Sequence, residues 1–286
     1  MSTIAITTEC VCDLPFSMLN ELRIESIYFN IQTDKGLFQD TTEISERNIL
    51  EYMAGGEKKA HSYEPAVEDY VQMFRRNLKK YQEVLHICIS AQISSAYAHA
   101  VMAKESMKEE GARIHIFDSK HLSSGMGILV YKAARLRDEG KNIFQIKEAL
   151  ADLQKRISTT FVTRNADYLY YNGKVKKSVR NLCHRFSIHP ILYMKNGKLC
   201  LKSVVIGNYD KACLRYVNGQ LRQNKDIDTE LAFVTHAGCS QARLSNIKDQ
   251  IKKYIEFEQL YLKTASATIS CNCGPDCFGV LFLRRK

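Results

Sequence analysis

The stretch from residue 84 to residue 97 constrains the fold most, because it joins a buried strand to a helix. Five of the seven residues from Val84 to Ser90 are apolar, and the pair Ser94-Ser95 can cap a helix that begins near Ala96. Free N–H groups at such a helix start, beside a serine hydroxyl, can hold a carboxylate or a phosphate. A capping role for Ser94 explains the same pattern without any ligand.

Strands and helices alternate through the first half of the chain. Strands are expected at 3–7, 24–31, 84–90 and 112–117, and helices after Pro15 and at 43–53, 67–81, 95–109, 123–136 and 143–156. Such alternation predicts a parallel sheet with crossover helices. Ligands of these sheets bind outside the carboxyl ends of the strands. We therefore expect three polar turns, at 9–13, 90–95 and 118–124, to converge on one edge.

The pattern changes after residue 157. An Asn196-Gly197 pair between two alternating runs predicts a β-hairpin. Helices at 210–222 and 240–256 then mix with strands at 229–235 and 259–270. We predict an α/β protein of two domains, an N-terminal parallel-sheet domain at 1–157 and a C-terminal α+β domain with a mixed or antiparallel sheet at 158–286.

Composition excludes several classes of protein. With 286 residues, 45% hydrophobic and 25% charged, and a mean hydropathy of −0.27, the chain has the balance of a globular protein. No apolar run reaches the ~18 residues of a membrane span, and Met1 leads into a strand without a basic leader, which predicts a cytoplasmic protein. Its ten cysteines are then expected to be reduced. The clusters at 10–12 and 271–277 lack zinc-ribbon spacing, so no metal is predicted.

The net charge of +10 is spread along the chain. Its densest group is Lys174, Lys176, Lys177, Arg180 and Arg185. On a helix, Lys176, Lys177 and Arg180 would fall near one side and form a basic face. Solvent alone, an acidic protein partner or a nucleic acid would each suit such a face. The sequence contains no recognition-helix or aromatic-platform motif, so we predict no nucleic-acid binding.

The usual signatures of enzymes are missing from the sequence. There is no P-loop, G-x-G-x-x-G, G-x-S-x-G or H-E-x-x-H motif. Ser94 as a nucleophile would need a base, and His99, His121 and His236 stand in no motif that orders one. An enzyme that uses Asp118 or His236 on a small carboxylate or phosphate substrate, at the same cleft between the domains, remains the alternative to a binding protein.

Five stretches, in order, resemble the DegV family of bacterial fatty-acid-binding proteins, which present an acyl chain to a fatty-acid kinase. They are Glu9-Cys-Val-Cys-Asp-Leu-Pro15, Ser62-Tyr-Glu-Pro65, Ile89 to Tyr97, Phe117-Asp-Ser with Ser123-x-Gly125-x-Gly127, and Cys271 to Gly279. The resemblance spans nearly the whole chain, and it rests on the order and spacing of the motifs together.

The resemblance implies two α/β domains, a long-chain fatty acid in a buried tunnel, and a carboxylate held between the domains. It implies neither catalysis nor a cofactor, and it makes the basic segment a docking site for an acidic kinase surface. The family's hydroxyl ligands fall on Ser62 and Ser94, and its histidine falls on Asn272. Ser95 and Lys174 stand where the family has glycine and arginine. Candidates for the tunnel wall are Phe161, Ile191, Phe233, Ile269 and Phe278.

Overall fold

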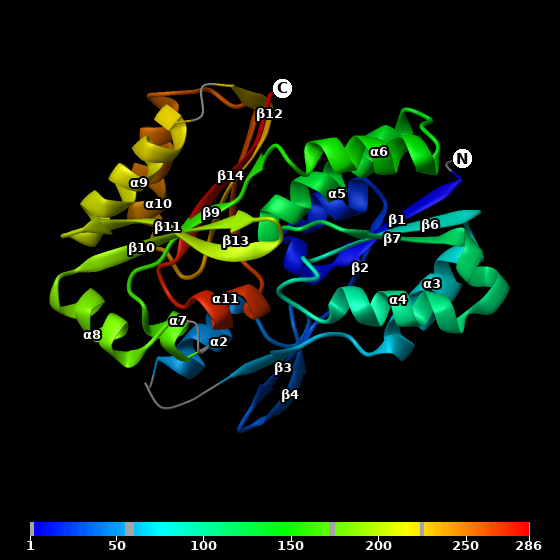
Figure 1. The fold of residues 1–286 in the computed structure, drawn as a ribbon, viewed down its shortest axis with the longest axis horizontal. Helices are drawn as coiled ribbons and strands as arrows, with labels where there is room; N and C mark the ends of the chain where they lie inside the picture. Colours follow the sequence, from blue (N-terminus) through cyan, green and yellow to red (C-terminus); the bar gives the residue numbers. More distant parts are fainter. Residues whose placement is uncertain (1–2, 55–59, 172–174, 224–225, 286) are drawn as a thin grey trace.

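The computed structural model describes residues 3–54, 60–171, 175–223 and 226–285. A parallel sheet of four strands, in the order β2-β1-β6-β7, forms the first half (Figure 1). Its strands are β1 (Ile4–Glu9), β2 (Ile24–Ile27), β6 (Glu83–Cys88) and β7 (Ile114–Asp118). Helices α3 (Val67–Leu78) and α4 (Ala96–Ser106) cover one face, and α5 (Ser123–Asp138) and α6 (Ile143–Leu153) cover the other. The predicted parallel sheet with crossover helices is confirmed.

The second half is built on a mixed sheet in the order β11-β10-β9-β14-β12-β13, with β8 paired to β14. Only the β12–β13 pair is parallel among these described pairs. The strands are β8 (Ile157–Ser158), β9 (Thr160–Val162), β10 (Ile188–Lys195), β11 (Lys198–Ile206), β12 (Ile227–His236), β13 (Gln259–Thr264) and β14 (Phe278–Arg284). Helices α9 (Tyr209–Gln223) and α10 (Gln241–Lys252) pack on one face. The predicted Asn196-Gly197 hairpin joins β10 to β11.

The predicted strand at 24–31 is wrong as a single element. It divides into β2 and β3 (Asn30–Thr33), which belong to different sheets. The buried side chain of Phe29 lies between them, where the chain leaves the parallel sheet. Strands β4 (Gly36–Gln39) and β5 (His61–Tyr63) flank β3 in a small antiparallel sheet.

Helix α11 (Ala267–Cys273) is a second departure, because a strand was predicted to run to residue 270. Its N–H groups have partners that favour a helix start. Asp40 accepts from Ala267 N–H at 3.0 Å and from Thr268 N–H at 2.8 Å, and the Ser266 hydroxyl caps the first turn. Helix α2 (Glu46–Met53) packs against α11, so residues of the first half hold this helix in place.

Helix α5 lies between the two large sheets and joins the halves. Its apolar side chains share one cluster with Phe161, Phe233 and Leu281 of the mixed sheet. The helix approaches β8–β9 so closely that a Cβ on Gly125 would lie 2.0 Å from Thr159 Oγ1. The change from parallel to mixed sheet falls between β7 and β8, and the division into two domains at residue 157 stays a prediction.

Three further helices in the described part of the chain are short. They are α1 (Phe16–Glu21), α7 (Asp167–Tyr171) and α8 (Lys177–Arg185). Across the part of the chain that the structure describes, no helix has both the length and the apolar character needed to cross a membrane.

Candidate functional site

The three polar turns meet at the carboxyl ends of β1, β6 and β7, as predicted. Asp118 accepts the N–H of Ala91 at 3.2 Å, and the Ser123 hydroxyl donates to Asp13 at 2.5 Å. Asp13 also accepts the N–H of Ser266 from the second half at 2.7 Å. These contacts fix the edge of the parallel sheet against the start of α11.

A pocket of about 210 Å³ lies where this edge meets the mixed sheet. Both halves of the chain contribute side chains to it, and most of the wall is apolar. The apolar residues are Phe29, Ile89, Ile93, Leu122, Phe161, Leu169, Leu192, Leu199, Ala237, Ala265 and Ile269. The pocket therefore suits an apolar ligand that lies between the two halves.

Ser94 lies in the pocket wall at the start of α4, and its hydroxyl makes two contacts. It accepts the N–H of Ala96, the first residue of α4, at 3.1 Å, but the N-cap position is Ser95, whose side chain makes no capping bond. The Ser94 hydroxyl also donates to Glu64 Oε1 at 2.7 Å, and Ser95 N–H donates to the same oxygen at 2.9 Å. This strand-to-helix turn therefore holds a carboxylate, which belongs to the protein itself.

Glu64 is half-buried and lines the pocket. Burial alone would raise the pKa of its carboxyl, but the hydrogen bonds from Ser94 and from the Ser95 N–H outweigh burial and lower the pKa. Glu64 is therefore ionised at neutral pH. Its negative charge lies at the polar end of an otherwise apolar pocket.

A second polar group comes from β5 and α11. The side-chain amide of Asn272 donates to the Ser62 hydroxyl at 3.1 Å and to the carbonyl of Thr268 at 2.8 Å. Asn272 lies in the last turn of α11, and Ser62 lies on β5, so the two halves meet at this contact. Both side chains line the pocket.

His236 and Thr268 each have a buried polar atom that has no hydrogen-bond partner among the described residues. These atoms are His236 Nδ1 and Thr268 Oγ1, and both residues line the pocket. Burial, with the charge of Lys263, lowers the pKa of His236 to about 4, so its ring is neutral at neutral pH. Neither atom was predicted from the sequence as part of a binding site. A buried polar atom without a partner marks a place where a ligand or a water can bind.

The structure brings together three of the five predicted binding residues, namely Ser62, Ser94 and Asn272. Ser95 has an exposed side chain that does not line the pocket, and only its N–H reaches Glu64. Lys174 lies outside the described residues. Of the predicted wall residues, Phe161 and Ile269 line the pocket. Ile191, Phe233 and Phe278 are instead buried in the hydrophobic cores of the mixed sheet, which corrects that prediction.

The alternative site for an enzyme does not form around Asp118. Its carboxylate accepts the N–H groups of Ala91 and Lys120, which is a turn-capping role, and it is not among the residues of the pocket wall. His236, the other residue of this alternative, does line the pocket.

Fold and pocket define a class of α/β protein with two halves and a mostly apolar pocket between them. A family model described as "Uncharacterised protein, DegV family" matches residues 3–285, and the chain belongs to the DegV family.

Relatives and solved structures agree with this assignment. A DegV domain-containing protein of Caldanaerobacter subterraneus subsp. tengcongensis is 26% identical over 285 residues, which cover 99% of each chain. A DegV family protein from Thermus thermophilus, described as fatty acid binding, superposes with a TM-score of 0.86 at 20% identity over 99% of this chain and 100% of the other. One from Eubacterium eligens, loaded with heptadecanoic acid, has a TM-score of 0.82 at 19% identity over 99% and 100%. The similarity confirms the α/β fold.

Proposed function

We propose that the protein binds a long-chain fatty acid in this pocket, with the carboxylate next to Ser62, Ser94 and Asn272. The acyl chain then lies against the apolar wall around Phe29 and Phe161. The fatty acids bound to structurally similar proteins support the class of ligand. The proposed role is binding and presentation, with no chemistry of the protein's own.

The observation that carries the proposal is the contact between Glu64 and the turn at Ser94. A serine hydroxyl and a backbone N–H converge on one carboxylate oxygen, at 2.7 and 2.9 Å. The turn therefore has the geometry that a fatty-acid carboxylate requires. A ligand carboxylate takes these donors when the side chain of Glu64 turns away, and the Asn272 amide orients the Ser62 hydroxyl beside it.

The acyl chain provides most of the binding free energy. Each buried CH₂ contributes about 0.8 kcal/mol, so a chain of about sixteen carbons contributes on the order of 10 kcal/mol before the costs of ordering and association. Charge-assisted hydrogen bonds to the carboxylate are about twice as strong as neutral ones. They offset the loss of its hydration and fix which end of the ligand faces α4.

A protein partner, with a fatty-acid kinase as the expected class, forms the second part of the proposal. Helix α8 exposes Lys177 and Arg185 together with Leu182 (51% exposed), and Phe186 (53% exposed) follows directly after the helix. An exposed surface that combines apolar and basic side chains suits an acidic protein. Arg180 is not part of it, because its guanidinium is held by Asp167. Helix α7, which contacts α8, contributes Tyr168 to the pocket wall, so the partner would bind near the ligand.

Mass spectrometry of an organic extract tests the ligand assignment. The protein is purified without detergent, unfolded, and extracted, and we expect about one long-chain fatty acid per chain. Delipidated protein should then be stabilised in thermal melts by a free fatty acid and less so by its methyl ester. The ester lacks the negative charge that strengthens hydrogen bonds from the donors at Ser94. No acid in the extract, together with no stabilisation by added acids, would contradict the proposal.

A further inference from the structure

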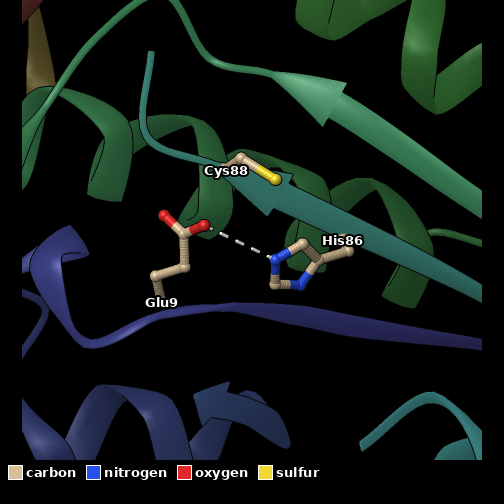
Figure 2. A group of neighbouring side chains, drawn as sticks. All are labelled: Glu9, His86 and Cys88. Carbon is tan, nitrogen blue, oxygen red and sulfur yellow. Dashed lines mark ion pairs between the residues drawn. The ribbon is translucent and has the colours of Figure 1, made fainter. Parts of the chain in front are cut away.

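A second cluster of polar side chains lies on the face of the parallel sheet that α3 and α4 cover, next to α3. It consists of Glu9, the last residue of β1, with His86 and Cys88 of β6, and all three side chains are fully buried. His86 and Cys88 are two residues apart on a strand, so their side chains point to the same face. Figure 2 shows the carboxylate of Glu9 facing the ring of His86, with Cys88 beside them. None of the three lines the fatty-acid pocket.

We propose that Glu9, His86 and Cys88 bind a divalent transition-metal ion, with Zn²⁺ as the best match. Carboxylate oxygen, imidazole nitrogen and thiolate sulfur are the three ligand types that zinc takes from proteins. The three ligand atoms lie within 4.8 Å of one another, and Glu9 Oε1 is 3.8 Å from His86 Nε2. Around tetrahedral zinc, ligand atoms are about 3.3 to 3.8 Å apart. The first pair thus nearly fits, and the widest closes by about 1 Å.

His86 provides the independent observation. Its Nε2 is buried and has no hydrogen-bond partner among the described residues, although it is aimed at Glu9. Its other nitrogen, Nδ1, lies 2.9 Å from the hydroxyl of Thr7. A histidine that ligates a metal commonly donates its second N–H to an oxygen, and Nδ1 can donate to Thr7 in this way in the tautomer that leaves Nε2 free to bind. A metal bond would satisfy this buried atom, which otherwise lacks a partner.

The surroundings of the cluster suit a buried ion. Ionised Glu9 and a Cys88 thiolate together cancel the two positive charges of the metal, so the complex is neutral and its burial is tolerated. Glu9 is held in position by the hydroxyl of Tyr70, which donates at 3.1 Å, and by the N–H of Ile89, which donates at 2.7 Å. Tyr70 also lies edge-on to the ring of His86, which helps to hold the ring in place.

On binding, the metal replaces the proton of the Cys88 thiol, and that proton is released to solvent. Because the cluster is fully buried, the ion enters while the chain folds, and it exchanges slowly afterwards. The rival explanation is a buried pair of Glu9 and His86 that face each other without a metal. That pair needs neither Cys88 nor a metal, so the two explanations predict different results for the same protein.

Metal analysis of the full-length protein decides between them. The protein is purified without chelators, and a second sample is unfolded, refolded with Zn²⁺ and freed of loose metal by gel filtration. We expect about one zinc per chain that a chelator removes only after unfolding. Refolding with Co²⁺ should give a thiolate-to-cobalt absorption band. His86→Ala and Cys88→Ala should each lower bound metal at least about tenfold, while Cys12→Ala, a buried cysteine outside the cluster, should not.

Fewer than about one zinc per ten chains after refolding with Zn²⁺ would overturn the proposal. So would unchanged metal content in His86→Ala or Cys88→Ala. The cobalt spectrum is measured on the unaltered chain, so the result does not depend on whether the variants fold. A refolded Co²⁺ protein without the thiolate band would also exclude Cys88 as a ligand.

Discussion

Glu64 provides the sharpest test of the binding site, because its carboxylate holds the donors that we assign to the ligand. Glu64→Gln removes the charge and keeps an oxygen that can still accept from Ser94 and Ser95. Two effects then favour a fatty-acid anion. The amide is more easily displaced, because neutral hydrogen bonds are about half as strong as charge-assisted ones. The repulsion between two carboxylates also disappears.

The size of the effect follows from the position of Glu64 at the half-buried edge of the pocket. Two like charges about 4 Å apart repel by about 1 kcal/mol in water and by about 4 kcal/mol at the effective dielectric of a protein surface. We expect a gain near the lower part of this range, so Glu64→Gln should bind a long-chain fatty acid about tenfold more tightly. Binding of a fatty alcohol of the same length should change much less.

Calorimetric titration of delipidated protein measures both affinities. Glu68→Gln is the matched control, because Glu68 is an exposed acid on α3 and its replacement changes the net charge equally. Equal or weaker binding of the fatty acid by Glu64→Gln would refute the reasoning. An equal gain for acid and alcohol would show that the ligand's charge does not lie near Ser94.

Three further variants test the site and the fold. Ser94→Ala should weaken fatty-acid binding about tenfold in the same titration, while Ser106→Ala, at the exposed far end of α4, should not. Burial raises the pKa of Asp13 to about 6, so the folded state holds this proton more tightly than the unfolded chain. The free energy of unfolding should therefore fall by about 3 kcal/mol as pH rises from about 4 to about 6. Urea titrations of wild type and Asp13→Asn at several pH values measure this fall as a change in the difference between the two proteins. A difference that does not change with pH would contradict the prediction. Gly125→Ala should destabilise the protein by about 1–3 kcal/mol through its clash with Thr159. Gly219→Ala, where the added Cβ meets nothing within 4 Å, should be neutral or stabilising, and equal effects of the two changes would contradict the close approach of α5.

Much of the fold could be predicted from local patterns. The strand at 84–90 and the helix from Ala96 could be predicted, because the apolar spacing and the Ser94-Ser95 pair both indicate a strand followed by a helix start. The strand break at Phe29 could not be predicted, because nothing in the local sequence indicates that β2 and β3 join different sheets. Helix α11 was also missed, since its start is satisfied by Asp40, more than 200 residues away in sequence. Contacts of this kind depend on tertiary structure.

The site shows the same limit. Ser62, Ser94 and Asn272 were identified through motifs, and the pocket collects all three. Glu64 belongs to one of those motifs, yet its contact with Ser94 joins a loop to a helix start 30 residues later. His236 was considered only as a catalytic base, because its missing hydrogen-bond partner can be seen only in the packed structure.

A crystal structure of the protein with a saturating long-chain fatty acid tests the central claim most directly. We predict that the acyl chain lies against Phe29, Leu122, Phe161 and Ile269, and that its carboxylate is within hydrogen-bond distance of Ser94 or Ser62, with the Glu64 side chain turned away from Ser94. An acyl chain elsewhere on the protein, or a carboxylate at the opposite end of the pocket with Glu64 still bound to Ser94, would contradict the account.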